Sequence, residues 1–118
     1  MNIEEFREYC LTKKGVTEEF PFDEQTLVFK VLGKMFALSG LEQQPPTANL
    51  KCDPERAIEL REEYDGIIIR GFHMNKKHWN TIEIVRLPHK LIMELIDHSY
   101  DLVVEKTPKK LRETLLNL

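Results

Sequence analysis

The strongest structural signal in the chain is TLVFKVLGKMFALS, residues 26–39. Large apolar residues recur at every second position on both sides of its centre, and a period of two is typical of β-strands. Only Leu32 and Gly33 separate the two runs, and a two-residue connection that contains glycine is typical of a β-hairpin. The stretch therefore predicts an antiparallel hairpin, and the side chains expected to face the core are Leu27, Phe29, Val31, Phe36 and Leu38.

Four helices are predicted from helical spacing and from the residues that begin them. Apolar residues recur at helical spacing through residues 3–13, directly after an asparagine that can cap the first turn. The second helix follows Asp53 and Pro54, and proline suits the first helical position. The third and fourth helices begin near Pro88 and Pro108. The side chains expected to face inward on the fourth helix are Leu111, Leu115 and Leu116.

Three further segments have strand-like composition, namely residues 48–52, 67–69 and 81–85. Strands that follow one another without an intervening helix are typical of antiparallel pairing. The order of elements therefore predicts an α+β fold in which helices pack on an antiparallel sheet. A chain of 118 residues has the usual size of one domain, so residues 1–118 are expected to form a single domain around one core.

Composition and the first residues bear on where the protein works. No run approaches the roughly 18 apolar residues that a membrane helix needs. Glu4 and Glu5 stand where a secretory signal would carry basic residues, so the protein is expected in the cytoplasm, with no membrane partner. Cys10 and Cys52 lie far apart, which argues against a disulfide framework or a cysteine zinc site.

Charge is divided unevenly along the chain. The net charge is −3, but residues 1–65 contain 8 Lys/Arg against 14 Asp/Glu, net −6, whereas residues 66–118 contain 9 against 6, net +3. An anionic partner would be attracted to the basic half. The second half is therefore where such a partner is expected to bind.

Motifs for common catalytic or cofactor chemistry are missing from the sequence. The five glycines are dispersed, which disfavours a phosphate-binding loop, and neither Ser39 nor Ser99 lies in a Gly-x-Ser-x-Gly turn. His73 and His78 are five residues apart, a spacing that does not place two metal ligands on one helical face. We therefore expect no catalytic residue, no cofactor and no metal, and favour a structural role for the two histidines.

Residues 71–80 form the most unusual stretch, polar and aromatic between two predicted strands. Lys76 and Lys77 could contact phosphate while Trp79 stacks on an unpaired base. The competing interpretation is that the lysines are solvated on an exposed turn and Trp79 is a core anchor. Other basic residues that could extend a phosphate-binding patch are Arg70, Arg86, Lys90, Lys109 and Lys110.

Several segments resemble the MmcQ/YjbR family of small bacterial proteins. They include FDEQTLVFKV at residues 22–31, HMNKKHWNT at residues 73–81 and SYDLV at residues 99–103. The resemblance extends over nearly the whole chain and preserves the order of the motifs. It implies a two-layer α/β sandwich with an antiparallel sheet, similar to type III secretion chaperones.

The resemblance also implies DNA binding through a double-wing motif. The loop motif is formed by His73, Asn75, His78 and Trp79, and the candidate nucleic-acid contacts are Lys76, Lys77, Arg70, Arg86 and Lys90. A second interpretation is a non-enzymatic protein-interaction module or chaperone-like adaptor. Fold alone does not decide between them, because one fold supports many functions. An enzyme is the least favoured class.

Overall fold

The computed structural model describes residues 1–71, 74–75 and 77–118. Within these residues six strands form one sheet in the order β1-β2-β3-β4-β6-β5, and all neighbouring strands are antiparallel. The predicted α+β fold with an antiparallel sheet is confirmed. The elements are α1 (Ile3–Leu11), β1 (Val16–Glu19), β2 (Thr26–Val31), β3 (Lys34–Gly40), β4 (Thr47–Lys51), α2 (Pro54–Glu63), β5 (Ile68–Arg70), β6 (Trp79–Glu83), α3 (His89–Glu105) and α4 (Lys109–Leu116).

The β2–β3 hairpin forms as predicted, with Val31 opposite Lys34 across a two-residue turn. Leu32 and Gly33 have φ angles of 52° and 79°. Positive φ at both central residues defines the turn type whose twist matches that of the flanking strands. Gly33 adopts this conformation without the steric cost that a side chain would add.

The alternation of β3 breaks at Phe36. The register of β2 against β3 shifts by one residue, which leaves Phe36 without a direct partner. Phe36 and Ala37 are adjacent, yet both lie in the core under the helices, whereas Leu38 packs with Val28 and Trp79 on the opposite face. The prediction that Leu38 shares the core with Phe36 was wrong, because a β-bulge changes which face each later residue occupies.

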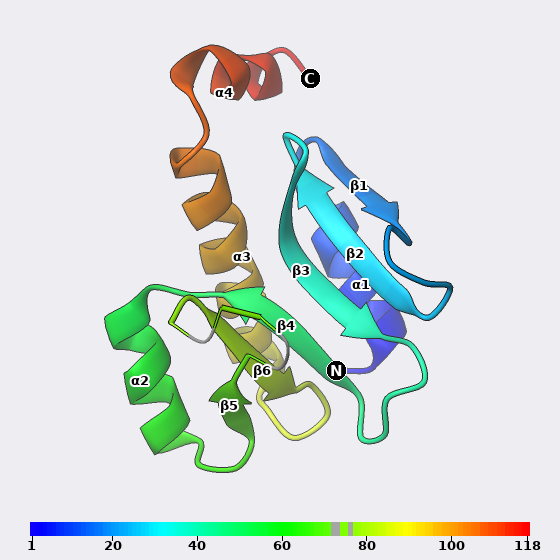
Figure 1. The fold of residues 1–118 in the computed structure, drawn as a ribbon, viewed down its shortest axis with the longest axis vertical. Coiled ribbons are helices and arrows are strands. Elements are labelled where there is room, and N and C mark those ends of the chain that lie inside the picture. The colour runs from blue at the N-terminus through cyan, green and yellow to red at the C-terminus, as the bar shows by residue number, and fades with distance from the viewer. Residues whose placement is uncertain (72–73, 76) are drawn as a thin grey trace.

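Three helices cover one face of the sheet (Figure 1). α1 begins at the cap predicted from the sequence, where Asn2 Oδ1 accepts a hydrogen bond from Glu5 N at 2.8 Å. It buries Phe6 against Phe29, with ring centroids 6.1 Å apart. α3 packs against β2, β3 and β4, while Ala57 of α2 joins the same core. Helix and sheet therefore form the two layers expected from the order of elements.

The start of β6 and the burial of α4 differ from the sequence prediction. β6 begins at Trp79, so Trp79 and Asn80 belong to a strand and not to the preceding loop. In α4 only Leu115 is buried, while Leu111 and Leu116 are exposed, because this helix lies beyond the end of α3 and the sheet does not reach it (Figure 1). None of the helices within the described residues, α3 included, is long and apolar enough to cross a membrane.

Candidate functional site

Trp79 anchors the face of the sheet opposite the helices. Only 7% of this residue is exposed, and it forms a small apolar cluster with Val28 and Leu38 that Met35 and Met74 partly cover. We call this side of the sheet the open face, because the helices bury their apolar side chains on the other side. The geometry supports the anchor role of Trp79. A base cannot stack on an indole ring that other side chains already cover.

Asn75 shapes the turn that leads into Trp79. Its side-chain Oδ1 accepts a hydrogen bond from Lys77 N at 3.0 Å, and its main-chain oxygen accepts from His78 N and Trp79 N at 3.1 and 3.0 Å. On the incoming side, Gly71 N donates to Trp79 O at 2.8 Å, and a Cβ added at Gly71 would lie 2.7 Å from Trp79 Cβ. These contacts tie Gly71 and Asn75 to the start of β6. The predicted site residues His73 and Lys76 lie outside the described residues.

Four lysines lie near the end of the sheet where β4 ends and β6 begins. Lys34 begins β3, Lys51 ends β4, Lys77 precedes β6 and Lys106 follows α3, and we call this group the lysine cluster. Burial lowers the pKa of Lys51, and the charges of Lys106 and Lys34 lower it further. Partial burial also lowers the pKa of His78, as do the charges of Lys106, Lys51 and Lys77. These effects place His78 near Lys51, Lys77 and Lys106, and place Lys51 near Lys34 as well.

Ser99 fixes the end of β4 that carries Lys51. Its hydroxyl group donates to Phe36 O at 2.5 Å and accepts from Lys51 N at 2.9 Å, so one buried side chain of α3 bridges β3 and β4. The bridge lies where the bulge in β3 ends direct pairing between these strands. One residue further on, Cys52 N donates to His78 O at 2.7 Å. Lys51 and His78 are thus positioned by backbone contacts that do not depend on their own side chains.

The structure does not bring Arg86 and Lys90 together with the cluster. Lys90 lies in the first turn of α3 and Lys106 follows its last turn. Sixteen residues of helix rise by about 24 Å, so these two lysines mark opposite ends of the molecule. Arg86 is beside Lys90 in the chain and forms a salt bridge with Glu83 at 3.0 Å. Of the basic residues singled out in the sequence, Arg86 and Lys90 therefore belong to a different surface from Lys77.

Arg70 lies near the loop but faces the other way. It pairs with Asn80 across β5 and β6, and residues opposite each other in a sheet share a face. Asn80 directs its side chain towards α2, where its Oδ1 accepts a hydrogen bond from Arg61 at 3.1 Å. Arg70 is therefore on the side of the sheet that carries the helices.

Sequence reasoning missed Lys34, Lys51 and Lys106, because each is a single lysine without basic neighbours on either side. The signal that could have found them is topological. Neighbouring strands of an antiparallel sheet run in opposite directions. The start of β3, the end of β4 and the start of β6 therefore lie at the same end of the sheet. Lys109 and Lys110 follow Lys106 after two intervening residues, and both are exposed at the start of α4.

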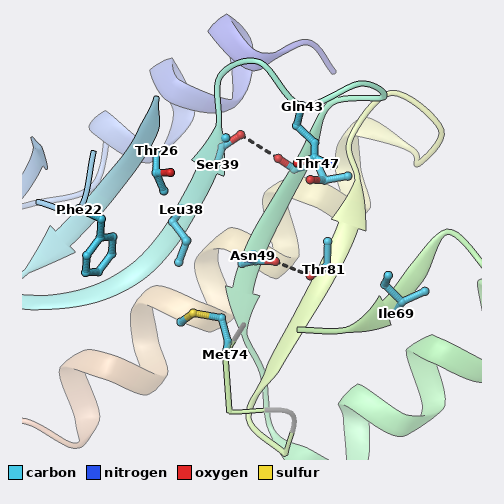
Figure 2. A pocket seen from close by; sticks show the side chains of 11 residues that line it. Phe22, Thr26, Leu38, Ser39, Gln43, Thr47, Asn49, Ile69, Met74 and Thr81 are labelled. Carbon is cyan, nitrogen blue, oxygen red and sulfur yellow. Dashed lines mark hydrogen bonds between the residues drawn. The ribbon is translucent and has the colours of Figure 1, made fainter. Parts of the chain in front are cut away.

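A groove of about 640 Å³ runs along the open face beside the lysine cluster. Asn49 and Thr81 lie on its floor, and Figure 2 shows the hydrogen bond that Thr81 Oγ1 donates to Asn49 Oδ1. Phe22 and Leu38 lie on one side of the groove and Ile69 on the other. None of the residues that line it is charged. The groove is therefore a neutral, partly apolar surface next to a basic one.

The potential nucleophiles within the described residues have structural partners or are buried. Ser39 donates its hydroxyl hydrogen to Thr47 O at 2.7 Å. Burial raises the pKa of Cys52 to about 11 and also raises the pKa of Cys10, so both thiols stay protonated near neutral pH. No group of three or more His, Cys, Asp or Glu side chains within residues 1–71, 74–75 and 77–118 is arranged to hold a metal ion.

The geometry defines a small α+β domain with one face of its antiparallel sheet covered by helices and the other left open. A family model described as YjbR matches residues 11–102, which is most of the chain. The uncharacterized protein YjbR of Escherichia coli K12 is 32% identical over 119 residues, a match that covers all of both chains. The chain belongs to the YjbR family, as its sequence motifs indicated.

Other relatives extend the same comparison. The uncharacterized protein YbdF of Escherichia coli O157:H7 is 37% identical over 92 residues, which cover 77% of this chain and 75% of that protein. The crystal structure of protein DR2400 from Deinococcus radiodurans, with a domain termed DUF419, matches with a TM-score of 0.90 and 42% identity. That match covers 97% of this chain and 87% of the other. The family and the fold are thus supported by sequence and by structure independently.

Proposed function

We propose that this domain binds nucleic acid through its phosphate backbone and that the lysine cluster makes the contacts. The observation that carries the proposal is the convergence of Lys34, Lys51, Lys77 and Lys106 from four separate parts of the chain. Isolated surface lysines need no ligand to explain them. Lys34 and Lys106 lie close enough to Lys51 for their charges to lower its pKa, and a bound anion would relieve that repulsion.

The charges around the cluster support an anionic ligand. The salt bridges among the described residues involve Arg7, Lys13, Lys30, Arg86 and His89, and none of them includes a lysine of the cluster. Every charged group that changes the pKa of Lys51 or His78 is positive. Phosphate groups along a nucleic-acid backbone are spaced to contact several such cations at once, and each contact releases counterions.

The proposal treats the protein as a binding domain and not as an enzyme. Ser39 and Ser99 already donate their hydroxyl hydrogens to main-chain oxygens, and the thiols of Cys10 and Cys52 are buried. We propose that the protein works in the cytoplasm, where free thiols such as Cys10 and Cys52 are kept reduced.

A fluorescence anisotropy titration tests the proposal. Wild type and the double variant Lys77→Ala/Lys106→Ala would be titrated into labelled 20-nucleotide single strands and duplexes at two salt concentrations. The wild type should bind with a dissociation constant between about 10⁻⁶ and 10⁻⁴ M and weaken steeply with salt. The double variant should bind more weakly and show a salt slope shallower by about 1.5 to 2, because two phosphate contacts are lost.

The matched control is Arg86→Ala/Lys90→Ala, which removes the same charge from the other end of the molecule. It should leave the salt slope unchanged. Absence of salt-sensitive binding by the wild type, or an equal effect of the two double variants, would contradict the proposal. In the first case, a protein-interaction module would become the better interpretation of the open face.

A further inference from the structure

The groove on the open face adjoins the lysine cluster along one strand. Asn49 lines the groove, and Lys51 lies two residues further on β4. Alternate residues of a strand point to the same face, and two residues span about 6.7 Å. A chain whose phosphates contact Lys51 could therefore place its next groups directly over the groove without leaving the sheet.

The lining of the groove suits flat, uncharged groups. Phe22, Leu38, Ile69 and Met74 provide apolar surface, and none of the lining residues is charged. Thr81 donates to Asn49 Oδ1, so the Asn49 amide nitrogen keeps its two hydrogens, and no acceptor for them is found among the described residues. Donors on an apolar floor can bind the ring nitrogens and carbonyl oxygens of nucleobases.

Phe22 supplies an aromatic face that Trp79 does not. Phe22 is 65% exposed, whereas Trp79 is 7% exposed. The residue after Phe22 holds the segment in place, because Asp23 Oδ1 accepts hydrogen bonds from Gln25 N and Thr26 N at 2.8 and 2.7 Å. An exposed aromatic ring on a fixed turn is a suitable platform for stacking an unpaired base.

We infer that the open-face groove binds the unpaired bases of a single-stranded nucleic acid whose phosphates contact the lysine cluster. The inference rests on the proposed function and specifies its ligand. The bases of a duplex are stacked on one another and paired, so they cannot lie face-on against Phe22. A neutral groove beside a basic end is complementary to a strand whose bases are neutral and whose backbone is charged.

The test compares Phe22→Ala with Phe20→Ala. Phe20 is 49% exposed and belongs to the same connection, but it does not line the groove. Anisotropy titrations would use a labelled 12-nucleotide thymidine strand and a mixed-sequence duplex of equal length. The wild type should prefer the single strand, and Phe22→Ala should weaken single-strand binding about tenfold while changing duplex binding less than twofold. Phe20→Ala should behave as wild type.

Two further variants separate stacking from simple apolar contact. Phe22→Leu should lose single-strand affinity as Phe22→Ala does, whereas Phe22→Tyr should retain it, because only the tyrosine keeps an aromatic face. Equal effects of Phe22→Ala and Phe20→Ala, or full retention by Phe22→Leu, would overturn the inference.

The outcomes also distinguish this inference from the proposed function. If the wild type binds single strand and duplex equally and only the lysine variant weakens both, backbone binding stands and the base site in the groove is refuted. If the wild type binds neither, both proposals are refuted.

Discussion

The two faces of the sheet are built from neighbouring residues but differ in what covers them. On one face, Phe29 and Phe36 are fully buried under α1 and α3. On the other face, Val28 and Leu38 form a small buried cluster with Trp79, and Met35 and Met74 pack against it. The covered face contains an apolar core, whereas the open face combines a small apolar cluster, a neutral groove and a basic end.

This difference indicates which surface is available for a ligand. Stability comes mainly from burying apolar surface, and the helix-covered face buries far more of it. The open face carries polar and cationic side chains, such as Asn49 in the groove and Lys51 beside it. Residues that do not stabilise the fold strongly yet lie together on one exposed face are the better candidates for binding.

The largest expected effect compares adjacent residues on opposite faces. Phe29→Ala should lower the free energy of unfolding by about 3–5 kcal/mol, because it opens a cavity among closely packed side chains. Val28→Ala removes fewer atoms from the smaller cluster and should cost about 2 kcal/mol. Urea unfolding followed by circular dichroism would measure both. Equal losses would show that the open-face cluster contributes as much as the core.

A smaller loss is expected when the bridge between β3 and β4 is removed. Ser99→Ala leaves Lys51 N and Phe36 O without their partner, and the expected cost is about 1–3 kcal/mol. Ser39→Ala removes one hydroxyl hydrogen bond at the other end of the same strand pair and should cost less. A larger loss for Ser39→Ala would mean that Ser99 does not hold the end of β4.

The smallest effect on stability concerns pH. Burial lowers the pKa of His98 from its ordinary value of 6.5, and the positive charge of Arg56 lowers it further. The neutral ring also accepts a hydrogen bond from Asp53 N at 3.1 Å. A lowered pKa in the folded state means that this contribution is present above pH 6.5 and is lost as the pH falls through the folded-state pKa. Stability should therefore decrease between pH 7.5 and 5.5.

The matched variant is His98→Gln, whose side-chain oxygen can still accept from Asp53 N but does not titrate in this range. Its stability should change less between the two pH values than that of the wild type. Parallel curves for the two proteins would assign the pH dependence to other groups.

Binding should respond to pH in the opposite direction. The surrounding Lys106, Lys51 and Lys77 lower the pKa of His78, and a bound phosphate would favour the protonated ring. Nucleic-acid affinity should thus increase modestly as the pH falls below about 6.5, the ordinary pKa of histidine. His78→Gln should flatten this dependence in anisotropy titrations. An unchanged dependence would place the bound phosphate away from His78.

The fold could be predicted from local patterns because each element carries its own signal. The hairpin at residues 26–39 and the helix caps at Asn2 and Asp53 were found as expected. Leu38 was assigned to the wrong face because the bulge at Phe36 depends on how two strands pair and not on alternation within one. Local periodicity therefore predicts which segments form helices and strands, but not which face of the sheet each side chain occupies.

The candidate site depended on long-range geometry, and for this reason the sequence located only part of it. Lys77 was identified by its place in the loop. Lys34, Lys51 and Lys106 join it only once the sheet order and the direction of α3 are known. The sequence left both stacking and packing open for Trp79, and its burial in the structure supports packing. Phe22 lies in a family motif but was not predicted as a site residue, because its exposure beside the groove depends on the fold.

The most direct test of the difference between the two faces is chemical-shift mapping. A ¹⁵N-labelled sample would be titrated with an unlabelled 12-nucleotide single strand. The largest amide shifts should fall on Asn49, Lys51, Lys77 and His78, with smaller shifts near Phe22, while α1 and the Arg86 and Lys90 end of α3 stay unchanged. Shifts confined to α1 or to the Arg86 and Lys90 end, or no shifts at all, would contradict the account.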